Sequence, residues 1–535
     1  MRASRTTLMT IAAAALLAAA GLAGSGDAGA ASSTYPAATP GVPCDKGSLP
    51  ETTQGRVPLA DVTSGRAAKG YDCNARRVGH FGATGGFRVE RYKDAAGHEC
   101  AYYDTTALFP KDTLTQGVEG TGTYVMDMTD PTKPVHSDTL RTPAFQSPHE
   151  SVRLNQKRGL LAAALSYPTF NPGFVDLYDV KADCRHPALL SSTPLGVLGH
   201  ESGFAPDGNT FYVASLYAHT ISAVDVSNPL VPSIAWTSFD YSPHGVSISD
   251  DGNRLYMAED AFDPSLGFSG LTVLDVSEVQ KRVLNPKVTL ISRLTWPNIG
   301  TPQNALPFTR NGHPYILEID EFGGSPTHIG AGRIIDMANE KAPKLVSNLR
   351  LQVNQPANQT GDQLKDPGAD NTNSPFQHFQ GYRGHYCALP TRVNPTIAAC
   401  SFIVSGLRVF DIADVAKPQE IAYYNSPVLP DANPAHQGSY AMASPAFALD
   451  RKEIWYSDAN SGFHVVRLTP NAHRVAGLGA KAPDSKGTGA STGRGGTSGG
   501  GLATTGQGPR AALLALAVLL LVGAGRAGYR RRALS

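Results

Sequence analysis

The stretch Gly270-Leu-Thr-Val-Leu-Asp275 decides the fold of this chain, because variants of it recur along the sequence. Each variant is a short run rich in β-branched and other apolar residues, and all but the last end in aspartate. The seven copies are Tyr124-Val-Met-Asp127, Val175-Asp-Leu-Tyr-Asp179, Ile221-Ser-Ala-Val-Asp225, Leu271-Thr-Val-Leu-Asp275, Arg333-Ile-Ile-Asp336, Leu407-Arg-Val-Phe-Asp411 and a degenerate Phe463-His-Val-Val-Arg467. Self-similarity with a unit of about 40–50 residues is typical of stacked or radial repeats.

The residues around each copy predict three further strands. In one unit, the runs Ser242–Ser249, Arg254–Ala258 and Pro286–Ser292 flank the repeated strand, and Asp251-Gly252 is a strong hairpin signal. Four strands per unit are typical of propeller blades. We therefore predict an all-β, seven-bladed β-propeller, with six or eight blades as alternatives. The blades are expected to begin near Gly85, His149, His200, His244, Gln303, His385 and His436.

Two segments do not follow the repeat. The segment from Val57 to His80 precedes the first blade, and we expect it to supply a strand that closes the ring with the last blade. The segment from Gln352 to Pro375 is polar and rich in Asn, Asp and Pro, which predicts a long surface loop.

The repeat resembles the LVIVD family, named for its Leu-Val-Ile-Val-Asp-like strand. The resemblance extends from Tyr124 to Leu468 and rests on strings of the Gly-Leu-x-Val-x-Asp-Val-Ser type. It implies a β-propeller. It implies no particular activity, because such propellers serve many roles.

The N-terminus indicates an exported protein, and the overall charge argues against a nucleic-acid partner. The chain has 535 residues and a net charge of +1, and its scattered Lys and Arg residues argue against a nucleic-acid partner. Residues 1–30 combine Arg2 and Arg5, a short apolar run and a small-residue site at Ala28-Gly-Ala30. This pattern predicts a secretory signal peptide, with a membrane anchor as the alternative. An N-terminal extension at 31–76 and the propeller at 77–472 follow.

The C-terminus resembles a sortase sorting signal of the Leu-Ala-x-Thr-Gly type. A Gly/Ser-rich linker at 473–501 leads into residues 502–535, which hold the pentapeptide, an apolar segment and a basic tail. The pentapeptide is Leu502, Ala503, Thr504, Thr505 and Gly506. The resemblance implies that a class E sortase cleaves after Thr505 and joins the chain to peptidoglycan.

The apolar segment from Ala511 to Gly525 is short for a permanent anchor. Fifteen helical residues reach about 22 Å, against about 30 Å of hydrocarbon core. We therefore expect transient membrane insertion before wall attachment, and a single-pass anchor is the alternative.

The six cysteines predict disulfides, because export permits oxidation. Cys387 and Cys400 flank a predicted hairpin, which favours a cross-strand bond. The other four allow three pairings, and we favour the pair Cys44 and Cys73 with the pair Cys100 and Cys184.

Histidine begins the first strand in five of the seven units, and Gln303 takes that place in another. The candidate channel residues are His149, Glu150, His200, Glu201, His244, Gln303, His385 and His436. If all inner strands start at one end of the central channel, these side chains converge there. Converging imidazoles suit Zn, Cu or Fe. The alternative is that they bond to channel water and to the backbone of the neighbouring blade. Histidine-rich channels also occur in the selenium-binding and methanethiol oxidase propellers, and that similarity implies copper.

The leading functional hypothesis is a secreted, wall-anchored surface module that binds a protein or carbohydrate ligand. We assign no catalytic residue, because no phosphate-binding loop and no His-Glu-x-x-His string occurs in the sequence. The alternative is a metal-dependent oxidoreductase with Cu or Zn on the channel histidines. A hydrolase that uses Glu150 and Glu201 is a third hypothesis. The pairs Glu259-Asp260 and Asp320-Glu321 are weaker Ca²⁺ candidates, and solvated turn positions are the simpler interpretation.

Overall fold

The fold is that of a computed structural model, which describes residues 35–105, 122–166, 173–216, 218–261, 267–321, 329–366, 381–427 and 439–477. The chain divides into two compact units, Met1–Ala480 and Lys481–Ser535, and all described residues belong to the first. The predicted signal peptide, the sorting signal and His436 lie outside the described residues. Of the helices described here, none is both long and apolar enough to cross a bilayer.

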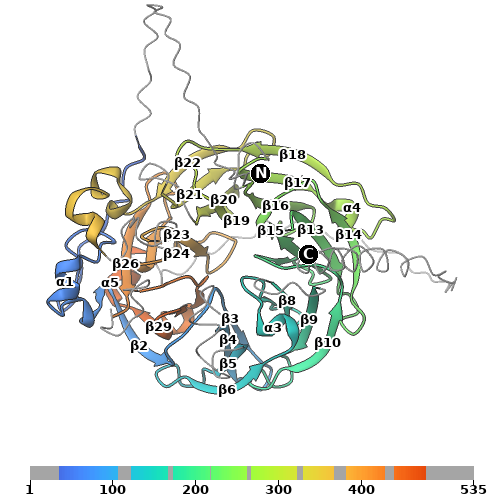
Figure 1. Cartoon of the computed structure of the whole chain (residues 1–535), viewed down its shortest axis with the longest axis horizontal. Helices are drawn as coiled ribbons and strands as arrows, with labels where there is room; N and C mark the ends of the chain where they lie inside the picture. Colours follow the sequence, from blue (N-terminus) through green and yellow to red (C-terminus); the bar gives the residue numbers. More distant parts are fainter. Residues whose placement is uncertain are drawn as a thin grey trace, which may run out of the picture. The chain divides into compact units, whose positions relative to one another are not determined.

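Seven antiparallel sheets surround a common centre, and each forms one blade (Figure 1). Five sheets contain four strands that follow one another in the sequence, and the other two each take one strand from the N-terminal segment. The predicted all-β propeller with seven four-stranded blades is thereby confirmed, apart from a fifth strand in blade 6.

The strands fall into blades as follows. Blade 1 consists of β3 (Val89–Lys93), β4 (Glu99–Asp104), β5 (Thr123–Asp127) and β6 (Val135–Leu140), and blade 2 of β7 (Arg153–Asn155), β8 (Leu160–Ala164), β9 (Phe174–Asp179) and β10 (Ala188–Pro194). Blade 3 consists of β11 (Gly203–Phe204), β12 (Thr210–Ser215), β13 (Thr220–Asp225) and β14 (Ser233–Ser238). Blade 4 consists of β15 (Pro243–Ile248), β16 (Arg254–Glu259), β17 (Gly270–Asp275) and β18 (Thr289–Leu294). Blade 5 consists of β19 (Pro302–Arg310), β20 (His313–Asp320), β21 (Gly332–Asp336) and β22 (Lys344–Leu349). Blade 6 consists of β23 (Gly384–Ala388), β24 (Ile397–Phe402), β25 (Gly406–Asp411) and β26 (Gln419–Asn425) with β1 (Tyr71–Cys73). Blade 7 consists of β27 (Ala446–Ala448), β28 (Glu453–Asp458) and β29 (Gly462–Leu468) with β2 (Ala75–Phe81).

The repeated stretch is the third strand of every blade, and its aspartate has a structural cause. In six blades the carboxylate accepts a hydrogen bond of 2.7–2.9 Å from the backbone N–H two residues later. The six acceptors are Asp127, Asp179, Asp225, Asp275, Asp336 and Asp411. This local bond turns the chain out of the strand, because it gives the backbone an alternative to the sheet ladder.

Apolar side chains on both faces of the sheets form the core between blades. Leu177 of blade 2, for example, belongs to one buried cluster with Phe211 and Val213 of blade 3. Sheets that are covered on both faces need near-continuous apolar strands. The fully buried strand β8, with the sequence Leu-Leu-Ala-Ala-Ala, meets that need.

The N-terminal segment closes the ring, as the sequence predicts. Strand β2 pairs antiparallel with β29 as the outermost strand of blade 7, while β1 pairs with β26 in blade 6. Between them Asn74 adopts a positive φ of 52°. Its side-chain amide donates to the backbone oxygens of Pro43 at 3.1 Å and Ile421 at 2.9 Å. One residue thus ties blade 6 to the segment that enters blade 7.

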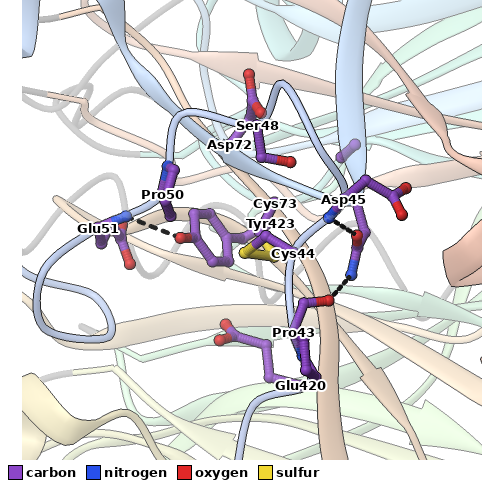
Figure 2. The surroundings of a disulfide bond; sticks show 12 residues. Pro43, Cys44, Asp45, Ser48, Pro50, Glu51, Asp72, Cys73, Glu420 and Tyr423 are labelled. Atoms are coloured by element: carbon purple, nitrogen blue, oxygen red, sulfur yellow. Dashed lines mark hydrogen bonds between the residues drawn. A yellow bond between two sulfur atoms is a disulfide. The ribbon is translucent and has the colours of Figure 1, made fainter.

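The N-terminal extension supplies polar partners to blade 6. The disulfide Cys44–Cys73 lies near Tyr423, whose hydroxyl accepts a hydrogen bond of 2.9 Å from the backbone N–H of Glu51 (Figure 2). The Glu51 carboxylate pairs at 2.5 Å with the fully buried guanidinium of Arg408 in β25. The extension therefore neutralises a charge inside the blade.

The first part of the segment predicted as a long surface loop contains short helices. Three short 3₁₀ helices, η3 (Gln352–Asn354), η4 (Pro356–Asn358) and η5 (Gly361–Lys365), occupy its first part, and Val353 is buried. The other helices within the described ranges are α1 (Leu59–Thr63), η1 (Ala67–Lys69), α3 (Pro143–Gln146), α4 (Ser277–Gln280), η7 (Leu449–Arg451) and α5 (Pro470–Val475).

The cysteines form three disulfides, and all three favoured pairings are confirmed. The bonds are Cys44–Cys73, Cys100–Cys184 and Cys387–Cys400. Cys387 and Cys400 lie opposite each other in the ladder of β23 and β24. The bond between Cys100 and Cys184 joins blade 1 to the turn after the third strand of blade 2.

Candidate metal centre

Four of the five candidate histidines lie together in the central channel. His149 and His200 precede the inner strands β7 and β11, whereas His244 and His385 lie within β15 and β23. Each side chain is at most 4% exposed. Parallel bridges join inner segments of neighbouring blades at Glu201 with Gly245 and at Arg88 with Ser444. With inner strands that run in the same direction, equivalent positions reach the same end of the channel. The fifth candidate, His436, lies outside the described residues.

Backbone irregularities direct these side chains toward one another. The ladders of β15, β19 and β23 each skip one residue, and the skipped residues are His244, Gln303 and His385. A bulged residue leaves the ladder, which re-aims its side chain. His149 has a positive φ of 49°, which is uncommon for a residue other than glycine. Four blades therefore depart from regular strand geometry at the same place.

The rings of His149, His200 and His244 form a continuous row. The ring centroids of both adjacent pairs are 4.6 Å apart. The Nε2 atoms of His149 and His200 face each other at 3.1 Å. Two nitrogen ligands of one tetrahedral zinc ion stand about 3.3 Å apart, given Zn–N bonds of about 2.0–2.1 Å. The pair therefore has the spacing of two ligands of one metal ion.

The second ring nitrogen of three histidines is bound to the backbone of the next blade. Nδ1 of His200 lies 3.2 Å from the carbonyl oxygen of His244. Nδ1 of His244 lies 2.7 Å from that of Pro302, and Nδ1 of His385 lies 2.5 Å from that of Met442. A carbonyl only accepts, so Nδ1 is the donor and Nε2 of the neutral ring is left as an acceptor. The predicted bonds to the neighbouring backbone are thus present, and they orient Nε2.

Two buried glutamates complete the cluster. Oε2 of Glu150 lies 3.0 Å from Nδ1 of His200, and Oε1 lies 3.1 Å from Nε2 of His385. Glu321, which follows β20, places Oε1 3.3 Å from Nε2 of His385 and Oε2 3.3 Å from Nε2 of His244. The cluster therefore draws side chains from blades 2 to 6.

The buried carboxylates favour the protonated form of two of the histidines. Burial opposes the charged form of His385, but Glu321 and Glu150 outweigh it and raise its pKa to about 10. The pKa of His244 is also raised, because Glu321 outweighs burial there. Burial alone would raise the pKa of both glutamates, yet the histidine contacts lower them. Burial instead lowers the pKa of His149 to about 3.

Glu201 contacts arginines rather than the histidine cluster. Its Oε1 accepts hydrogen bonds from Nη2 of Arg88 and Nδ2 of Asn304, each at 2.6 Å, and from Nη2 of Arg153. Arg88 also donates through Nε to the backbone oxygen of Glu150 at 3.1 Å. Glu201 therefore belongs to a layer adjoining the histidines, which does not match its predicted place beside them.

Gln303 and Tyr386 hold the Glu150 carboxylate. The Tyr386 hydroxyl donates to Oε2 of Glu150 at 2.7 Å, and the Gln303 amide donates to the same oxygen. In a regular strand Tyr386 and the preceding His385 would point to opposite faces. The bulge at His385 instead lets both contact Glu150.

Sequence reasoning missed Glu321, Tyr386 and Arg88 as members of this site. The interpretation of Glu259-Asp260 and Asp320-Glu321 as solvated turn positions is wrong, since all four side chains are at most 3% exposed. The Glu259 carboxylate pairs with Arg293 of the fourth strand in blade 4, and the Asp320 carboxylate pairs with Arg333 of the third strand in blade 5. The acidic pair Asp320-Glu321 at the end of β20 was the one sequence signal that could have pointed to Glu321.

The chain matches no family model, and no curated protein matches it significantly. Among solved structures, it is similar to hydrazine synthase of Kuenenia stuttgartiensis, at 12% identity and a TM-score of 0.44 over 73% of this chain and 97% of the other. It is also similar to the periplasmic gluconolactonase of Pseudomonas aeruginosa, at 12% identity and a TM-score of 0.41 over 65% and 92%. A protein from Lactobacillus plantarum aligns at 13% identity and a TM-score of 0.43 over 67% and 95%. Likenesses this distant transfer no activity to the chain.

Proposed function

We propose that the chain is exported, attached to the cell wall and there presents a propeller whose central channel binds a transition-metal ion. One observation carries the metal site. His200, His244 and His385 each place Nδ1 at a backbone carbonyl of the next blade. This arrangement leaves Nε2 of His200 facing His149, and Nε2 of His244 and His385 facing buried glutamates. Metal-binding histidines in proteins divide their two nitrogens in this way.

Nε2 of His149, Nε2 of His200 and a carboxylate oxygen of Glu150 are the proposed first ligands. One ligand atom from each lies within 4.8 Å of the others. Imidazole with carboxylate suits Zn²⁺, Cu²⁺ or Fe²⁺, whereas Ca²⁺ takes oxygen ligands. His385 adjoins this set through its contact with Glu150.

The chain's own residues fix and shield the proposed ligands. Tyr386 and Gln303 hold one oxygen of Glu150, and the ring of Phe87 packs 4.5 Å from that of His149. When bound, the ion would supply Lewis-acid or redox chemistry. Such a site would suit the secreted metal-dependent oxidoreductase that the sequence offers as the alternative to a ligand-binding surface module.

Metal binding should release protons. The glutamates carry two negative charges, and the protons on His385 and His244 that balance them have raised pKa values. A divalent ion brings the same charge, so we expect about two protons to leave as it binds. Affinity for Zn²⁺ should therefore rise with pH toward 10, the pKa range of His385.

Titration of the metal-free, full-length protein with Zn²⁺ or Cu²⁺ tests the metal site. Calorimetry in buffers of different ionisation enthalpy counts the protons, and elemental analysis after dialysis counts the metal. We expect about one tightly held ion per chain. A protein that retains neither metal, or that binds one without releasing protons, does not have this site.

The wall-attachment part of the proposal rests on the terminal segments and on the disulfides. The repeats are proposed to be of the LVIVD type, and residues 502–506 are proposed as the recognition sequence of a class E sortase that uses peptidoglycan as acceptor. Three disulfides suit a protein that folds in an oxidising compartment.

Thr505→Ala should move the protein out of the peptidoglycan-linked fraction. The proposed sortase joins the carboxyl group of Thr505 to the wall, so a changed residue there blocks the transfer. The matched control is Thr504→Ala, at the variable position of the pentapeptide. Cells expressing each variant are digested with a muramidase, and the released protein is measured by immunoblot. Equal wall linkage in both variants, or native protein in the medium with its arginine tail intact, would refute attachment.

A further inference from the structure

A cavity of about 510 Å³ lies in the channel beyond the histidines. Its lining includes Glu90 and Lys93 of β3 and residues Cys387–Pro390 at the end of β23. His385 lies at the start of that same strand. Because the inner strands run in the same direction, the cavity lies further along the channel than the histidines, and Arg88 at its near end adjoins their layer. None of the proposed metal ligands lines the cavity.

Cationic groups dominate the charged part of the lining. One lining residue, Glu90, is acidic, and five are basic, namely Arg88, Arg91, Lys93, Arg153 and Arg392. Arginine carries planar N–H groups that match two oxygens of a carboxylate or phosphate at once. In the part of the chain that the structure describes, the hydrogen bonds of Arg88 use Nε and Nη2, so Nη1 is left for another partner.

Carboxylates beside the arginines compensate this charge only in part. The Glu201 carboxylate is shared by the guanidiniums of Arg88 and Arg153. The Glu99 carboxylate is shared by those of Arg91 and Arg451. A third carboxylate, that of Glu90, lies 4.0 Å from Nη1 of Arg153. The other acidic partners, Asp450 and Asp250, have side chains that are 60% and 65% exposed and are screened by water. Burial, and then the nearness of Arg88, lowers the pKa of Arg153 to about 10. An anion in the cavity would relieve this repulsion.

The rest of the wall is apolar, with Leu306, Leu389 and Phe447 among the lining residues. We propose that this cavity binds a small organic anion, whose carboxylate or phosphate group meets the arginines and whose apolar part lies against these three side chains. The size of the cavity lies in the range usual for small-molecule sites. No proposed metal ligand lines this site, although Arg88 also donates to the backbone oxygen of Glu150 beside the metal centre.

Binding of phenyl phosphate, benzoate and the neutral benzyl alcohol to the full-length protein tests the proposal. Calorimetry is carried out with a chelator present, so that a bound metal cannot provide the anion contact. We expect at least one of the two anions to bind with a Kd below about 1 mM, and benzyl alcohol to bind at least tenfold more weakly. The anion that binds more tightly identifies the head group. Benzyl alcohol binding as tightly as both anions, or no binding of either anion, would overturn the proposal.

Substitutions at two positions locate the site. Lys93→Glu changes an exposed side chain at the end of β3, and Arg392→Gln removes a guanidinium while Arg392→Lys keeps its charge. We expect the first two to weaken binding of the anion at least tenfold and Arg392→Lys to retain most of it. Lys181→Gln, at an exposed position after the third strand of blade 2, is the matched control. If Arg392→Gln does not fold, Lys93→Glu decides the outcome alone, and unchanged affinity in that variant would refute the site.

Discussion

Replacing His200 by alanine should weaken Zn²⁺ binding by more than about 100-fold, because even partners of ligands contribute about 10- to 100-fold to metal affinity. The change removes the Nε2 atom that faces His149 at 3.1 Å. It also removes the Nδ1 atom that lies 3.0 Å from the Glu150 carboxylate. A ligand and the positioning of another proposed ligand are thus lost together. Competition with a chromophoric chelator at fixed pH measures the affinity.

The control for this experiment is His186→Ala. The His186 side chain is 62% exposed at the outer edge of blade 2, so its loss should leave the affinity unchanged. A purely structural role of His200 predicts a different result, in which the variant unfolds at lower temperature but added Zn²⁺ stabilises it as much as it stabilises the native protein. Equal stabilisation by Zn²⁺ in both proteins would therefore contradict the metal site.

The repeated strand and the ring of blades could be predicted because their causes are local. The aspartate that ends each copy accepts a bond from the backbone two residues later, so the signal and its structural effect lie within a few residues. Histidines at equivalent positions meet because parallel inner strands bring equivalent positions to one end of the channel. The sequence repeat alone is therefore enough to predict that four histidines meet, and the angles between the blades need not be known.

The rest of the site depends on contacts that do not repeat. Glu321 follows the second strand of blade 5, and its carboxylate reaches His385 only because of how blades 5 and 6 pack. Tyr386 would point away from the channel in a regular strand, and the bulge at His385 has no clear sequence signature. Glu201 is the opposite case, since the sequence predicts it beside the histidines but the structure does not place it there. It follows a channel histidine, as Glu150 does, yet its carboxylate pairs with Arg88 and Arg153 instead of the histidines. Such pairings are properties of the assembled ring.

The second large effect is expected at the closing strand, where Gly79→Val should lower the free energy of unfolding by about 3 kcal/mol or more. Gly79 lies within β2, and a Cβ atom there would lie 2.0 Å from the backbone oxygen of Pro131 in blade 1. That oxygen belongs to a turn between two paired strands, so it cannot move without disturbing blade 1. The clash therefore acts on the contact between the first and last blades. Equilibrium urea unfolding, followed by tryptophan fluorescence, measures the loss.

Arg77→Val separates this clash from an ordinary change in the same strand. Arg77 is exposed in β2, and valine is well suited to a strand, so this variant should stay within about 1 kcal/mol of the native protein. Similar stability of the two variants would show that β2 does not hold the ring closed. The metal centre gives a second measurement of the same event. Phe87, which packs against His149, belongs to the segment between β2 and β3, and its backbone oxygen accepts a bond from Ser444 just before β27. A ring that opens between blades 7 and 1 should therefore also lose Zn²⁺ affinity, although no metal ligand has been changed.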